Sequence, residues 1–102
     1  MLGGVTLIER IVVLGAGHVG TALSSMCGAV GVRHAVVDDR PRFARAERLP
    51  SAERVLCMPF PAALDRLEPD SRCAVVILTR CHRTDMACLE HALATDASYI
   101  GL

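Results

Sequence analysis

Short apolar runs alternate along the chain with segments whose apolar side chains recur every three or four residues. The runs are rich in β-branched residues and stop at glycine, proline or aspartate, which is typical of strands buried on both faces of a sheet. The periodicity between them is typical of amphipathic helices. The pattern predicts strands over residues 10–14, 33–37, 54–58, 73–78 and 98–102, and helices after Gly20 up to Gly31, over 61–67 and over 85–95.

Three local features refine these boundaries. Pro41 needs no N–H donor at a first helical position, so it predicts a short helix after the second strand. Thr84 or Asp85 is a favourable N-cap for the last helix. Gly31 is the predicted C-terminal stop of the first helix.

The alternation of strands and helices from end to end indicates βαβ units and a parallel sheet. Because such crossovers are right-handed, few topologies remain. We expect an α/β, three-layer Rossmann-like fold with about five parallel strands in the order 3-2-1-4-5. A chain of 102 residues supports one core, so residues 1–102 are predicted to be a single domain. The sequence ends on an apolar strand, which predicts either a longer parent protein or pairing of that strand with another subunit in a homo-oligomer.

The composition excludes several classes of partner. There are 11 basic and 11 acidic residues, the formal net charge is zero, and aromatic residues make up 3% of the chain. Binding of nucleic acid needs a basic excess or stacking side chains, so nucleic acid is not an expected partner. No apolar run reaches the ~18 residues of a membrane span, and no secretory leader is evident. The five cysteines are odd in number and lack C-x-x-C spacing, which favours free thiols in the cytoplasm.

The strongest candidate for a binding site is a glycine-rich string that follows a predicted strand and opens a predicted helix. In this context the first glycine permits a tight turn, the second lets the backbone approach a phosphate, and the third lets helix and strand pack closely. Unpaired N–H groups at the helix start attract negative charge. We predict that the string binds the phosphate of a cofactor; the competing interpretation is a turn that serves packing alone. Its residues are Gly15, Ala16, Gly17, His18, Val19 and Gly20.

An acidic residue at the end of the next strand completes the dinucleotide-binding pattern. Asp38 follows the run over 33–37 and is predicted to accept hydrogen bonds from ribose hydroxyls. Its charge would repel a 2′-phosphate, which favours NAD-type over NADP-type ligands, although Arg40 lies close by. Asp39 is included in the same predicted site, although the favoured interpretation is a solvated loop residue.

A second group of polar residues follows the fourth strand, where ligands of such sheets bind. There Thr79 would hydrogen-bond a ligand and His82 would act as an acid, base or donor. An ordinary loop that leads into a capped helix explains both residues equally well. His34 and His91 are expected to be structural or solvated. No nucleophile elbow, H-E-x-x-H motif or metal-binding cluster appears in the sequence, so binding is favoured over catalysis.

Three strings, VVLGAGHVG at 12–20, VVDDRP at 36–41 and ASYIGL at 97–102, together resemble the Rossmann domain of the XdhC/CoxI family. These are xanthine dehydrogenase accessory proteins. The first string alone is moderately specific, because many nucleotide-binding domains contain one like it. Its combination with the other two is much more specific, and the resemblance covers nearly the whole chain.

The resemblance implies a cytoplasmic accessory role. Members of the family are thought to bind the molybdenum cofactor, to protect it during sulfuration, and to help insert it into molybdenum hydroxylases such as xanthine dehydrogenase. Molybdopterin carries a phosphate, which a glycine-rich helix start is suited to hold. The implied cofactor is therefore the molybdenum cofactor or an NAD-type dinucleotide, and the implied partner is a molybdenum hydroxylase.

The chain departs from the family pattern after the fourth strand and at its ends. The usual T-H-x-H-x-x-D is matched at Thr79, His82 and Asp85, but Arg80 replaces the first histidine. Family members also carry an amino-terminal CoxI-type domain and a Gly-Ser-Arg-Arg-Lys stretch after the position of Leu102, so we expect one domain of a longer accessory protein. The alternatives are a NAD-binding regulatory domain or a dehydrogenase fragment, which share the glycine-rich turn but not the VVDDRP and YIGL strings.

Overall fold

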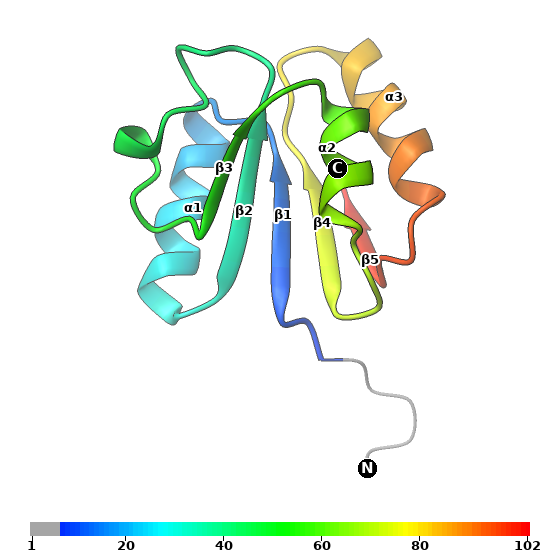
Figure 1. Cartoon of the computed structure of the whole chain (residues 1–102), viewed down its shortest axis with the longest axis horizontal. Helices are drawn as coiled ribbons and strands as arrows, with labels where there is room; N and C mark the ends of the chain where they lie inside the picture. Colours follow the sequence, from blue (N-terminus) through cyan, green and yellow to red (C-terminus); the bar gives the residue numbers. More distant parts are fainter. Residues whose placement is uncertain (1–6) are drawn as a thin grey trace.

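The computed structural model describes residues 7–102 and contains one parallel sheet of five strands. Each strand lies within one residue of its predicted limits. The strands are β1 (Arg10–Leu14), β2 (Arg33–Asp38), β3 (Arg54–Cys57), β4 (Cys73–Ile77) and β5 (Tyr99–Gly101). Their order, β3-β2-β1-β4-β5, confirms the predicted Rossmann-like topology (Figure 1).

Three helices cover the two faces of the sheet (Figure 1). They are α1 (His18–Val30), α2 (Phe60–Leu67) and α3 (His82–Leu93). α1 packs on one face while α2 and α3 pack together on the other, which gives three layers. Because each crossover leaves the carboxyl end of a strand, all three helices begin at that edge of the sheet. Within residues 7–102, no helix has the length and apolar character needed to cross a membrane.

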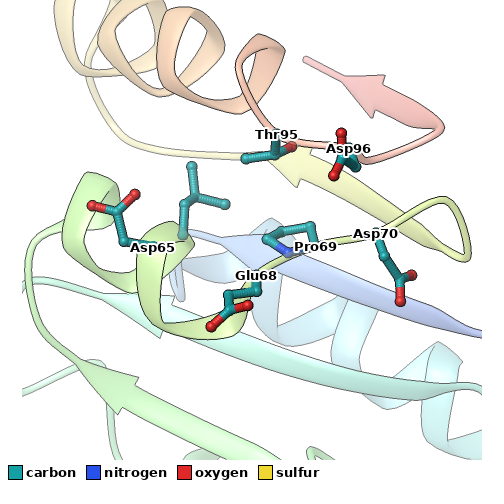
Figure 2. Close-up of a pocket in the computed structure, with 7 residues that line it drawn as sticks. Asp65, Glu68, Pro69, Asp70, Thr95 and Asp96 are labelled. Carbon is teal, nitrogen blue, oxygen red and sulfur yellow. The ribbon is translucent and has the colours of Figure 1, made fainter.

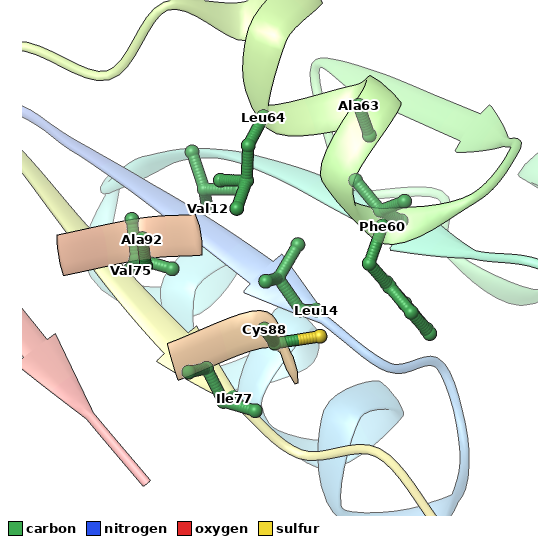
Figure 3. Close-up of a cluster of buried hydrophobic side chains, with 10 residues drawn as sticks. Val12, Leu14, Phe60, Ala63, Leu64, Val75, Ile77, Cys88 and Ala92 are labelled. Atoms are coloured by element: carbon green, nitrogen blue, oxygen red, sulfur yellow. The ribbon is translucent and has the colours of Figure 1, made fainter. Parts of the chain in front are cut away.

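Alternate residues of the strands fill two cores, one on each face. Val12 and Leu14 of β1 face α2 and α3, where they join a cluster that includes Phe60 and Cys88 (Figure 3). Val13 of the same strand faces α1 instead. Burial on both faces explains why these strands are continuous apolar runs in the sequence.

His34 and Ser24 form a buried polar pair between β2 and α1. His34 Nδ1 lies 3.1 Å from the carbonyl oxygen of Val32, and its Nε2 lies 2.7 Å from Ser24 Oγ. Since a carbonyl can only accept, Nδ1 donates to Val32, and Nε2 forms the hydrogen bond with the Ser24 hydroxyl. Both residues are buried and both ring nitrogens are used, so His34 has the structural role expected from the sequence.

The segment after β2 forms no helix at Pro41, contrary to the prediction. The carbonyl oxygen of Arg40 accepts from the N–H groups of Phe43 and Ala44, which makes a single turn. A short 3-10 helix follows only at Ala46–Arg48. Side-chain contacts at the carboxyl edge of the sheet, described below, hold this segment in place of helical hydrogen bonds.

All three helices begin earlier than predicted, α2 by one residue and the other two by three. α1 starts at His18, so its first turn contains the third glycine of the string, Gly20. α3 starts directly after Cys81, which is its N-cap residue, so Thr84 and Asp85 lie inside the helix and do not cap it. A first helical turn that contributes little to the core leaves no mark in the apolar periodicity, and helix boundaries are the least certain part of such patterns.

Candidate functional site

The glycine-rich turn joins β1 to α1 at the carboxyl edge of the sheet. Gly15 has a φ of +122°, and a Cβ there would overlap the carbonyl group of Leu78. A Cβ at Gly20 would overlap the carbonyl oxygen of Gly15. Both positions therefore require glycine, the first for the shape of the turn and the second for the close approach of the helix to the strand.

Gly17 differs from these two glycines because nothing lies within 4 Å of the place that a Cβ would take. It is the N-cap residue of α1, with a φ of −76°, and no side chain caps the helix there. The first helical turn therefore presents N–H donors that the helix itself does not use. These donors and the positive end of the helix dipole favour an anion in the open space above Gly17.

A cavity of about 400 Å³ opens beside this helix start. The turn, the segment after β2 and the loop after β4 form its walls. Its lining contains three guanidinium groups and no carboxylate, so it suits a negatively charged ligand. The lining residues are Gly17, His18, Val19, Arg40, Phe43, Arg48, Leu78 and Arg80.

Asp38, at the end of β2, is fully buried and lies behind the cavity rather than in its lining. Its Oδ2 accepts from the N–H of Ala16 and its Oδ1 from the N–H of Arg40, each at 2.9 Å. The Arg40 guanidinium adds two more bonds, from Nε to Oδ1 at 2.9 Å and from Nη2 to Oδ2 at 3.0 Å. Burial alone would raise the pKa of this carboxyl, but the hydrogen bonds from Arg40 and Ala16 outweigh it and lower the pKa to about 2.

This geometry changes the role that the sequence predicted for Asp38. Contact with ribose hydroxyls needs a free acceptor, and the four hydrogen bonds to Asp38 fill both of its oxygens. Asp38 instead positions the glycine-rich turn through Ala16 and fixes Arg40 in the cavity wall. Direct contact with a ribose would require Arg40 to leave.

Arg40 and Arg48 hold the ring of Phe43 in the same wall. The guanidinium carbon of Arg40 lies 3.7 Å from the ring centroid and that of Arg48 lies 5.0 Å from it, both within cation–π range. Arg48 Nη1 donates to the carbonyl oxygens of Ala16 and Phe43, each at 2.8 Å. Because these partners are carbonyls rather than carboxylates, no negatively charged partner offsets the charge of Arg48 next to the glycine-rich turn.

The loop after β4 is held by its own hydrogen bonds. The hydroxyl and the N–H of Thr79 both donate to Asp85 Oδ1, the N–H at 3.2 Å. Arg80 reaches across to Asp39, with 3.3 Å between Nη1 and Oδ1. His82 is exposed and does not line the cavity. The structure therefore brings Arg80, but neither Thr79 nor His82, into the lining of the cavity.

A larger cavity, of about 460 Å³, lies at the opposite edge of the sheet, where α2 and α3 end (Figure 2). Four carboxylates line it, from Asp65, Glu68, Asp70 and Asp96, and its lining contains no arginine or lysine. Negative side chains and the negative ends of helix dipoles both oppose phosphate binding. We therefore place the candidate site at the smaller cavity.

Some of the predicted site residues line the cavity and the others lie outside its lining. Gly17, His18 and Val19 line the cavity. Phe43 and Arg48 also line the cavity but are not among the predicted site residues, because the segment that carries them shows no periodicity. The predicted residues outside the lining are Gly15, Ala16, Gly20, Asp38, Asp39, Thr79 and His82.

Comparisons with known proteins agree with this architecture. The family model of the XdhC Rossmann domain matches residues 11–102. A crystal structure described as a xanthine dehydrogenase from Bacillus halodurans matches 91% of this chain with a TM-score of 0.78 and 28% sequence identity. This chain spans only 28% of the length of that chain. No curated protein gives a significant match.

Proposed function

The chain belongs to the XdhC family, whose Rossmann domain it forms over residues 11–102, and we propose that it is the cofactor-binding module of a cytoplasmic accessory protein. The enzymes that it would serve are molybdenum hydroxylases of the xanthine dehydrogenase type. The likeness to a structure described as a xanthine dehydrogenase supports this association. The module would hold a phosphate-bearing cofactor while that cofactor is matured or inserted.

The observation that carries this proposal is the cavity at the glycine-rich turn. The open space above Gly17, the N–H groups of the first turn of α1 and the guanidinium groups of Arg40, Arg48 and Arg80 suit a phosphate. That phosphate would be the one of molybdopterin or of a dinucleotide. When it is bound in the hydroxylase, the molybdenum cofactor supplies the redox chemistry of that enzyme. The residues of this chain would bind and orient the phosphate of the cofactor.

The substitution Gly17→Asp tests the site with little risk to the fold. Its Cβ enters open space, and aspartate is a favoured N-cap residue whose carboxylate would take the place of the phosphate. We expect the melting temperature of the unliganded protein to stay the same or to rise. The affinity for molybdopterin, measured by thermal shift and calorimetry, should fall by more than about tenfold, because like charges then face each other.

Ser25→Asp is the matched control, since it adds the same charge to the exposed side of α1, away from the turn. This variant should bind as the wild type does. Equal affinity of the wild type and Gly17→Asp would remove the glycine-rich turn from the site. A thermal shift with NAD but not with molybdopterin would favour the alternative function, a nucleotide-binding regulatory domain.

A further inference from the structure

The cavity at the glycine-rich turn offers no acceptor to a ribose 2′-hydroxyl at the end of β2. In domains of this fold a carboxylate at that position reads the hydroxyl. Here the Asp38 carboxylate is fully buried, and its two oxygens accept four hydrogen bonds from Ala16 and Arg40. A ligand that needs a hydroxyl acceptor therefore finds the guanidinium of Arg40 in that place.

Arg40 is a fixed cation with unused donors. Its Nε and Nη2 are tied to Asp38 and its guanidinium stacks on Phe43, so the side chain has already lost its freedom before a ligand arrives. Among residues 7–102, its Nη1 has no hydrogen-bond acceptor, and the side chain lines the cavity. A planar guanidinium held in this way is suited to a phosphate oxygen.

The charge around Arg40 strengthens this preference. Arg48 shares the ring of Phe43 with Arg40 and donates only to uncharged oxygens, two carbonyls and the hydroxyl of Thr21, so no carboxylate paired with it offsets its charge. The wall at the end of β2 therefore carries one guanidinium paired with Asp38 and a second that is not paired. Arg80 and its partner Asp39 lie beside this wall, so three guanidinium groups stand against two carboxylates, and a dianionic phosphate placed there would meet a net positive charge.

We propose that this cavity selects adenine nucleotides that carry a 2′-phosphate over those with a free 2′-hydroxyl. The 5′-phosphate groups accept hydrogen bonds from the N–H groups at the start of α1, and the 2′-phosphate contacts Arg40. The ligand class is thus the 2′-phosphorylated, NADP-type dinucleotide rather than the NAD type. This inference rests on the proposed function, because it concerns the same anion-binding cavity.

The pair 2′,5′-ADP and 5′-ADP tests the selectivity, because both carry two phosphates and differ in where the second is attached. Calorimetry on the intact chain at one salt concentration should give 2′,5′-ADP a Kd lower by more than about tenfold, as expected for an added charge-assisted contact. Equal affinities, or tighter binding of 5′-ADP, would overturn the inference. Failure of both nucleotides to bind would overturn it as well.

Two variants attribute the preference to Arg40. Arg40→Gln should reduce the ratio of the two affinities to near one while 5′-ADP still binds. Because that change leaves a buried carboxylate unpaired, the double variant Asp38→Asn with Arg40→Gln supplies a neutral pair of similar shape, with the same expected ratio. Arg42→Gln is the control: Arg42 is exposed, does not line the cavity, and should keep the full preference.

The outcomes separate this inference from the proposed function. If both nucleotides bind equally and Gly17→Asp abolishes both, the anion site stands and the 2′-phosphate preference falls. If no nucleotide binds but molybdopterin does, the accessory function stands and the inference falls. If the preference is present and Arg40→Gln retains it, Arg40 is not the group that reads the phosphate and the inference is overturned.

Discussion

The two ends of the sheet carry cavities of similar size and opposite charge. The cavity at the carboxyl end, of about 400 Å³, is lined by three arginines, whereas one of the cavities at the amino end, of about 460 Å³, is lined by four carboxylates and no arginine. The parallel topology adds to this difference, because all three helices begin at the first end and finish at the second. The proposed phosphate site is therefore chosen by the sign of the helix ends and of the side chains, and not by cavity size.

The two ends also accommodate a positive φ in different ways. At the carboxyl end Gly15 has a φ of +122°, where an L side chain is strained and a Cβ would collide with Leu78. At the amino end Glu68 follows α2 with φ 47° and ψ 62°, within the left-handed helical region that L residues can enter. Position 15 therefore accepts only glycine, whereas position 68 accepts residues with a side chain at a cost in free energy.

Gly15→Ala should produce the largest loss of stability. We expect the free energy of unfolding to fall by more than about 3 kcal/mol, because the change combines backbone strain with an overlap in the core of the turn. Urea denaturation followed by circular dichroism measures this difference. Gly17→Ala, in open space, should stay within about 0.5 kcal/mol of the wild type. Similar stability of both variants would show that the turn accepts a side chain at either position.

Asp38→Asn comes next and contrasts a buried carboxylate with an exposed one. Loss of the charge that Arg40 pairs with should cost about 2 kcal/mol of unfolding free energy, because the hydrogen bonds are buried and charge-assisted. At the amino end, Asp65 Oδ1 lies 2.9 Å from His91 Nε2, but the side chain of Asp65 is 73% exposed. Asp65→Asn should therefore change the stability by less than about 0.5 kcal/mol. Equal effects would mean that burial does not set the strength of these pairs.

The pH dependence sharpens this contrast. Folding lowers the pKa of Asp38 from 3.8 to about 2, so the ionised carboxylate stabilises the fold fully above about pH 4 and loses its effect as the pH falls through about 2. The difference in unfolding free energy between the wild type and Asp38→Asn should be constant near neutral pH and should shrink across that window. A difference that does not depend on pH would show that the amide loses shape complementarity rather than charge.

The location of the candidate site could be predicted from the sequence because the signals for the glycine-rich turn are local. The change from an apolar run over 10–14 to helical spacing after Gly20 placed the glycine-rich turn, and βαβ alternation placed the ligand site at the carboxyl ends of the strands. Both signals depend only on residues that are close together in the chain. The same kind of signal predicted both limits of every strand to within one residue.

The partners of the charged side chains could not be predicted in this way. Asp38 and Arg40 are two residues apart, and their spacing does not say whether the carboxylate faces a ligand or the neighbouring guanidinium. The expectation of an NAD-type ligand was drawn from the charge of Asp38, with Arg40 noted only as a neighbour, and the 2′-phosphate proposal reverses it for this reason. Arg48 binds the carbonyl of Ala16, which is 32 positions away, through a segment without periodicity.

Glu68→Gly should give the smallest effect, and its sign is opposite to that of Gly15→Ala. Glycine enters the left-handed region without the cost of a Cβ but loses more backbone freedom on folding, so we expect a gain of about 0.5 kcal/mol in unfolding free energy. The substitution also removes one carboxylate from the acidic cavity, and Glu68→Gln separates the two causes because it removes the charge and keeps the side chain. If Glu68→Gln leaves the stability unchanged, the gain in Glu68→Gly comes from the left-handed backbone conformation at this position. If it gains as much as Glu68→Gly, repulsion among the four carboxylates is the cause, and the amino end is destabilised by the same negative charge that makes it unsuitable for phosphate.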